Sequence, residues 1–148
     1  MQALSSISTV AHVIQLAVAP VFLLTGVGAV LSVLVNRLGR VVDRFRVLER
    51  SLPEAGDHAQ AGHETEMAIL ARRARMIHWA ISLCTVCALL VCLVIGALFV
   101  GSVTGMDLSV AIASLFIAAM LALIAGLLCF LREITLATGS IHNVGRKA

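Results

Sequence analysis

Residues 10–35 read VAHVIQLAVAPVFLLTGVGAVLSVLV, about 26 residues without a charged side chain. A hydrocarbon layer roughly 30 Å thick is crossed by about 20 apolar residues of α-helix. Because a segment in lipid must satisfy its own backbone hydrogen bonds, this stretch predicts a transmembrane helix. The next residues, NRLGRVVDRFRVLER at 36–50, contain five arginines, so they mark where the first span ends.

The composition of the whole chain agrees with this assignment. Of its 148 residues, 60% are hydrophobic and 13% are charged, whereas about a quarter of the residues in soluble domains are charged. Two further apolar runs of sufficient length lie at about 77–101 and 108–131. The alternating pattern of barrel strands is missing. We therefore predict an all-α integral membrane protein, a single domain over 1–148 with three transmembrane helices.

The basic residues are distributed asymmetrically between the loops. Segment 36–76 holds eight of the eleven, and the other three, Arg132, Arg146 and Lys147, follow the third span. Neither the N-terminal segment nor the predicted turn GSVTGMD at 101–107 holds any. Since cytoplasmic loops collect Lys and Arg, we expect 36–76 and the C-terminus in the cytoplasm and the N-terminus outside.

Segment 36–76 itself has helical periodicity. Its first half carries an apolar residue every three or four positions, namely Leu34, Leu38, Val41, Phe45, Leu48 and Leu52. LPEAGDHAQAGHE at 52–64 has the Pro, Gly and Asp of a turn, and helical spacing then resumes. This pattern predicts a cytoplasmic helical hairpin between the first and second spans.

One face of the first span carries polar residues at both ends and small residues in the middle. Steps of three and four residues connect His12, Gln15, Ala19, Phe22, Gly26, Ala29, Val33, Asn36 and Arg40. We call these nine residues the span-one stripe. Gly28 and Ser32 beside it form a small-xxx-small series typical of helix packing in membranes. Pro20 adds a predicted bend, because it cannot donate a backbone hydrogen bond.

Two functions are compatible with this pattern. Three helices cannot comfortably surround a water-filled path, so an ion or small-solute channel requires a homo-oligomer with the span-one stripe lining its axis. The alternative is a non-conducting membrane scaffold whose cytoplasmic hairpin docks a partner. A wet axis would favour the channel, and a dry axis with an exposed apolar groove on the hairpin would favour the scaffold.

A group of charged residues is expected at the cytoplasmic ends of the helices. Its members are Arg37, Arg40, Asp43, Arg44, Arg132 and Glu133. The positive-inside rule explains Arg132 but not the acid beside it, so we expect Glu133 to pair with an arginine of segment 36–50. Anionic lipid is a candidate partner at about 1 kcal/mol per basic residue. Nucleic acid is not expected, because the basic face is predicted to lie against the membrane.

The sequence offers little for catalysis, a cofactor or a metal. Cys84 and Cys87 form a C-x-x-C inside an apolar span with no charged neighbour to activate a thiol, which is typical of small packing residues. His58 and His63 flank the predicted turn close to acidic residues. The simpler interpretation of both is a side chain exposed to solvent. His12 could sense pH in a constriction with Gln15, and the alternative is an interfacial histidine without a role. We expect no enzyme activity, no cofactor and no metal site.

Three segments resemble a known family. IQLAVAPVFLLTGVGAVLSVLVNRLGRVVDR at 14–44, RRARMI at 72–77 and FLREI at 130–134 are similar to an uncharacterised family of small bacterial membrane proteins, known only as a domain of unknown function. The resemblance covers nearly the whole chain apart from 52–62. It implies a bacterial inner-membrane protein with three spans, and it transfers no activity or catalytic residue.

Overall fold

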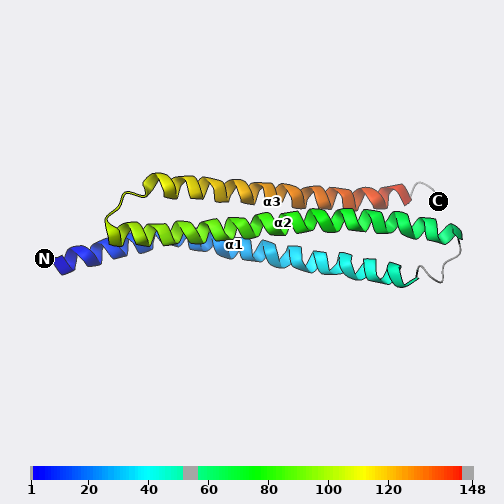
Figure 1. Cartoon of the computed structure of the whole chain (residues 1–148), viewed down its shortest axis with the longest axis horizontal. Coiled ribbons are helices and arrows are strands. Elements are labelled where there is room, and N and C mark those ends of the chain that lie inside the picture. Colours follow the sequence, from blue (N-terminus) through cyan, green and yellow to red (C-terminus); the bar gives the residue numbers. More distant parts are fainter. Residues whose placement is uncertain (1, 52–56, 145–148) are drawn as a thin grey trace. The chain divides into compact units, whose positions relative to one another are not determined.

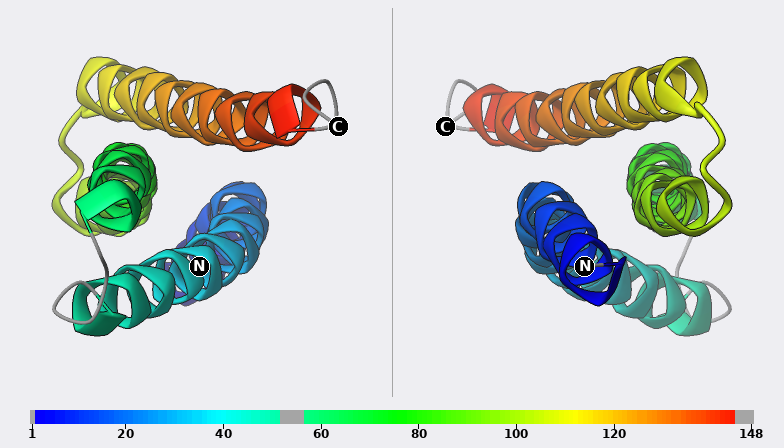
Figure 2. Two further views of the ribbon diagram at one scale, coloured as in Figure 1. Left: turned by 90° about the vertical axis from the view of Figure 1, so that its right-hand side faces the viewer. Right: turned by 90° about the vertical axis from the view of Figure 1, so that its left-hand side faces the viewer.

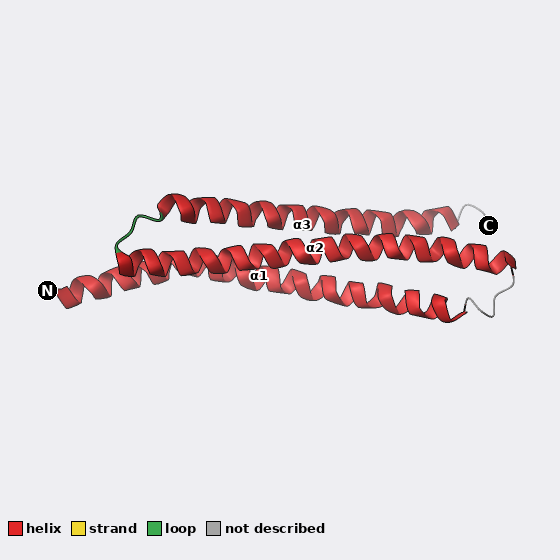
Figure 3. Ribbon diagram, viewed as in Figure 1, coloured by secondary structure: helices red, strands yellow, loops and turns green. Residues whose placement is uncertain are grey.

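The computed structural model of the chain describes residues 2–51 and 57–144, with the side chains of 11–51 and 62–135. Within these ranges the fold consists of α1 (Gln2–Ser51), α2 (Asp57–Thr104) and α3 (Ser109–Val144), labelled in Figure 1. Every described residue outside 105–108 is helical, as Figure 3 shows. Each helix is long and apolar enough to cross a membrane. The all-helical class and three helices of spanning character are therefore confirmed.

The predicted turn between the first two helices is shorter than expected. α1 continues past residue 35 as far as Ser51, as its apolar spacing predicts. α2, however, begins at Asp57, so residues 57–64, predicted as part of the turn, are helical. Ala and Gln at 59–61 have high helix propensity, which favours an early start of α2. Residues 52–56 lie outside the described part of the chain.

The second turn is also shorter than the predicted 101–107. α2 continues through Gly101 to Thr104, and only residues 105–108 connect it to α3. Gly105 has a φ of 68°, and its N–H donates to the carbonyl of Gly101 at 2.9 Å. This is the αL cap that ends many helices, in which a single bond closes the last turn. A glycine at 105 is what this cap requires, because only glycine adopts a positive φ without steric cost.

Asp107 stabilises the first turn of α3. Its Oδ1 accepts hydrogen bonds from the backbone N–H of Ser109 at 3.0 Å and from the Ser109 hydroxyl at 2.6 Å. These bonds favour the charged carboxylate and lower the pKa of Asp107 below its ordinary value. The turn thus combines a helix C-cap with an acceptor for the next helix within five residues of chain.

Contacts divide the described residues into two compact units. Unit 1 contains the first part of α1, up to Leu31, and residues Leu83–Ile124. Unit 2 contains the described residues of Ser32–Ser82 and the described residues from Ala125 onward. Each unit takes a segment from each of the three helices, and the segments can be followed by colour in Figure 2. The prediction of one domain over 1–148 stays a prediction.

Burial along every helix follows a seven-residue repeat. In α1 the buried positions are Val13, Pro20, Val27, Leu34, Val41 and Leu48, joined by Ala17 outside the repeat. In α2 they are Leu70, Ile77, Cys84 and Val91, joined three residues later by Ala80, Cys87 and Val94. In α3 they are Ala119, Gly126 and Glu133. A repeat of seven is the period of helices that pack along one seam at a small crossing angle.

The C-cap of α2 gives the first prediction. Gly105→Ala should lower the free energy of unfolding by about 1–2 kcal/mol, because alanine disfavours the left-handed conformation. Gly96→Ala is the matched control, since a Cβ at Gly96 meets nothing within 4 Å and φ there is not positive. Thermal unfolding in detergent measures both. An equal or smaller loss for Gly105→Ala would contradict the role of the cap.

Candidate functional site

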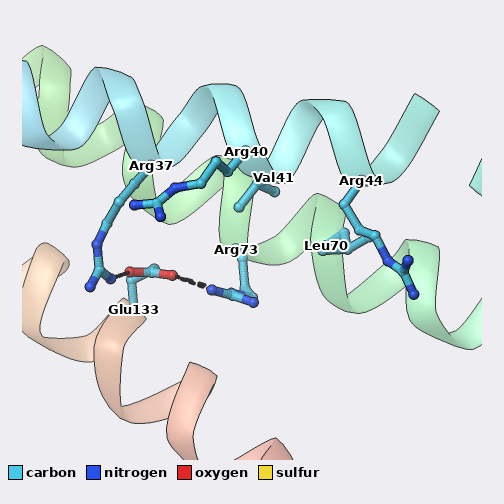
Figure 4. Close-up of a pocket in the computed structure, with 7 residues that line it drawn as sticks. All are labelled: Arg37, Arg40, Val41, Arg44, Leu70, Arg73 and Glu133. Carbon is cyan, nitrogen blue, oxygen red and sulfur yellow. Dashed lines mark hydrogen bonds and ion pairs between the residues drawn. The ribbon is translucent and has the colours of Figure 1, made fainter. Parts of the chain in front are cut away.

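The described part of the chain buries one charged side chain completely, the carboxylate of Glu133 on α3. Arg37 of α1 donates from Nη1 to Oε2 at 2.8 Å. Arg73 of α2 donates from Nη2 at 2.8 Å and from Nε at 3.2 Å, both to Oε1. All three helices of unit 2 therefore meet at one carboxylate, as Figure 4 shows.

This arrangement offsets the cost of burying a charge. An isolated carboxylate away from water is strongly unfavourable unless it is paired and hydrogen-bonded. Here both oxygens accept charge-assisted bonds from guanidinium groups, which are about twice as strong as neutral ones. The two arginines keep about 30% of their side-chain surface exposed, so they lose less hydration than the acid does. The guanidinium of Arg37 also lies 5.2 Å from the ring centroid of Phe130, within cation–π range.

The seven-residue repeat explains why these side chains meet. Glu133 occupies the buried position that follows Ala119 and Gly126 on α3. Arg37 lies three residues after the buried Leu34, and Arg73 lies three residues after the buried Leu70. Both are seam positions of their helices, where a side chain points toward neighbouring helices. The charges are thus placed in the core of unit 2 by the same periodicity that places its apolar residues.

A cavity of about 360 Å³ lies beside the carboxylate in unit 2. It is lined by Arg37, Arg40, Val41, Arg44, Leu70, Arg73 and Glu133, the residues drawn in Figure 4. Arg44 forms an ion pair with Glu66 at 3.0 Å, in which both side chains are largely exposed. Arg40 has no hydrogen-bond or ion-pair partner among the described side chains. We call these seven residues the arginine cavity.

The structure brings together four of the six residues predicted as a charged group. Arg37, Arg40, Arg44 and Glu133 line one cavity, and the expected contact of Glu133 with an arginine of segment 36–50 is present. Asp43 is exposed and lines no part of it. Arg132 points elsewhere and lines a separate cavity of about 270 Å³ with Arg72. The sequence analysis missed Arg73, although three-residue spacing from Leu70 was a usable signal.

The span-one stripe lies on the exposed side of α1. All nine of its side chains, from His12 to Arg40, are exposed, and Phe22 keeps 73% of its surface. Gly28 and Ser32 are exposed too, and a Cβ at Gly26 or Gly28 would meet nothing within 4 Å. Pro20, by contrast, is buried. The small-residue series therefore makes no packing contact within its own chain.

The remaining candidate ligands show no grouping. Cys84 and Cys87 are buried as free thiols on the seam of α2. Nδ1 of His63 is buried without a partner, but His63 lies on α2 away from any cluster of ligands. His58 has no described side chain. Among the described residues, no three His, Cys, Asp or Glu side chains come together as a metal site.

The fold and the buried ion-pair cluster define a small all-helical protein with three helices of membrane-spanning character. The chain belongs to the family described as protein of unknown function DUF2721, which matches residues 17–143. The resemblance drawn from the sequence is thereby confirmed. Searches of the curated proteins and of the solved structures gave no match.

The cluster around Glu133 gives the second prediction. Glu133→Gln should lower the free energy of unfolding by roughly 2–4 kcal/mol, because it leaves two inward-facing guanidinium groups without a counter-charge. Thermal unfolding in detergent is the measurement. Glu49→Gln is the control, since Glu49 is an exposed acid on α1, and its loss should stay within about 0.5 kcal/mol. Equal shifts in the two variants would show that the cluster does not stabilise the fold.

Proposed function

We propose that this membrane protein forms a homo-oligomer in which the span-one stripe faces the subunit axis and allows an ion or small solute to pass. The observation that carries the proposal is the exposure of polar side chains on an apolar helix. His12, Gln15 and Asn36 face away from their own chain. Polar groups in that position are poorly accommodated by lipid, and a neighbouring copy or a water-filled path would accommodate them.

The packing of each unit supports the proposal that a second copy takes part. The seams of the three helices are filled by packed side chains, such as Val27, Val91 and Ala119 in unit 1. Apart from Arg40, which lines the arginine cavity, the stripe is exposed on the outside of its own chain, so a path along it needs walls from other chains. Small residues such as Gly26 and Ala29 would allow close approach of a second α1.

The orientation follows from the distribution of arginine. We propose that the protein lies in the bacterial inner membrane with the N-terminus outside and the hairpin of residues 36–76 in the cytoplasm. The arginine cavity then lies at the cytoplasmic boundary of the spans. No catalytic role is proposed, because the buried acid is already committed to two arginines in a structural cluster.

Flux through liposomes tests conduction and gives the third prediction. Phe22→Ala should raise the flux about tenfold or more, because it removes a bulky side chain from the proposed path. Gly26→Leu should block the flux, because it adds a bulky side chain to the same path. Neither change removes a contact within the chain, since Phe22 is 73% exposed and Gly26 has open space around it. The conclusion requires that oligomer size stays the same in every variant.

Matched controls lie on α2. Leu89→Ala truncates a side chain with 61% exposure, and Gly96→Leu adds a side chain where nothing lies within 4 Å. Both should leave the flux unchanged. Intact oligomers that are silent in the native chain and in Phe22→Ala would exclude the channel, and control variants as effective as the α1 variants would exclude the stripe as its lining.

A second candidate is a scaffold that docks a partner on the cytoplasmic hairpin. It is favoured by an open groove of about 460 Å³ between α1 and α2 in unit 2. The groove is mostly apolar, with Val42, Phe45 and Ala74 in its walls and Arg75 and His78 at its edge. An exposed apolar groove of this kind often marks an interaction site.

The scaffold gives the fourth prediction. A photo-crosslinking residue at Val42 should capture a discrete partner in living cells, and Phe45→Lys should reduce that adduct about tenfold because it places a charge in the groove. The same crosslinker at Val47, which is 58% exposed and outside the groove, is the control. Equal adducts at both positions would argue against docking in the groove.

A further inference from the structure

The arginine cavity carries an unbalanced charge. Four arginines line it, and the only acid among its lining residues is Glu133. That acid is fully buried and already accepts three hydrogen bonds, so it has little capacity to neutralise a further guanidinium. Like charges in one cavity repel each other, and the repulsion grows where water is partly excluded. The site therefore favours an anion from outside the cluster.

Hydrogen-bond donors remain available to such an anion. Each guanidinium has five N–H donors, of which Glu133 takes one from Arg37 and two from Arg73. Arg40 gives none to any described side chain, and in Figure 4 it extends along α1 toward Arg37. Arg44 is held by Glu66, whose side chain is 41% exposed. An exposed pair of this kind is weak and is easily replaced.

We propose that the arginine cavity binds a phosphate group, carried either by an anionic lipid headgroup or by a soluble phosphate compound. Planar guanidinium groups match phosphate oxygens with two parallel hydrogen bonds, which is why arginine clusters recognise phosphate. The volume of about 360 Å³ lies in the range of small-molecule sites, roughly 300–1,000 Å³, so it has room for more than a bare ion. Val41 and Leu70 supply an apolar wall for the rest of the ligand.

Glu133 has a positioning role in this site. It fixes the guanidinium groups of Arg37 and Arg73 by hydrogen bonds of 2.8 Å before any ligand arrives. A site whose donors are already ordered loses less conformational entropy on binding. Glu66 has the opposite effect, because its carboxylate occupies donors of Arg44 that a phosphate would use. The proposal depends on this local geometry and is independent of whether α1 lines a channel.

Binding to the full-length protein in an uncharged detergent at 0.15 M salt tests the proposal and gives the fifth prediction. The lipid arm compares short-chain phosphatidylglycerol with diacylglycerol of the same chain length, and the soluble arm compares glycerol 3-phosphate with glycerol. At least one phosphate-bearing probe should bind, and its phosphate-free counterpart should not. Binding of phosphatidylglycerol alone assigns the site to a lipid headgroup, and binding of glycerol 3-phosphate assigns it to soluble phosphate compounds.

Variants separate the cavity from general surface charge. Arg40→Gln should raise the dissociation constant about tenfold, the equivalent of one lost charge-assisted hydrogen bond. Arg46→Gln removes the same charge from an exposed position on α1 outside the cavity and should change it by less than about twofold. Glu66→Gln should lower the dissociation constant about twofold to threefold. A misfolded variant cannot produce such a gain in affinity. The proposal would be overturned if Arg40→Gln and Arg46→Gln weakened binding equally. It would also be overturned if probes with and without phosphate bound equally, or if neither phosphate probe bound.

Discussion

The burial of one carboxylate constrains the arrangement of unit 2. Glu133 has no exposed surface, and a charge in that position is tolerated only when cations and hydrogen bonds replace its lost water. Arg37 comes from α1 and Arg73 from α2, so the requirement can be met only when both helices hold α3 in one axial register. A displacement of α3 by one residue would turn the acid away from the seam, whereas an apolar seam would tolerate such a displacement better. The ion-pair cluster thus specifies which residues face each other, and apolar burial supplies the attraction.

The same seven-residue repeat gives α1 a buried side and an exposed side. The seam of α1 contains Val27, Leu34 and Val41 and is used by the chain itself. Another face contains the span-one stripe, which is exposed along its length and meets the arginine cavity only at Arg40. Small residues that pack helices in membranes are concentrated on this open face. The contacts within the chain therefore use one side of α1, and a change on the exposed side can be made without removing a buried side chain of the fold.

Sequence reasoning predicted the features that depend on the length of apolar runs or on the position of charged residues. The three spans follow from the length of apolar runs, and the contact of Glu133 follows from an acid that topology rules do not explain. It did not identify Arg73, and it placed helical residues 57–64 and 101–104 in turns. In a segment where nearly every residue is apolar, hydrophobicity does not distinguish the buried face from the lipid-facing one. The repeat is visible only once burial is known, because Cys84, Val86 and Leu89 are similar in polarity but differ in exposure.

Arginines that orient a helix in a membrane can acquire a second role when the chain folds. The positive-inside rule requires only that basic residues follow the first span, and it places no condition on which face they occupy. In this protein Arg37 and Arg44 lie seven residues apart and so recur on one side of α1, and Arg40 between them lines the same cavity. One buried acid cannot neutralise this group, and Glu66 reaches it only from an exposed position. The excess positive charge is therefore gathered around a cavity in which Glu133 orders two of the four guanidinium groups, an arrangement that the same charges spread over an exposed loop would lack.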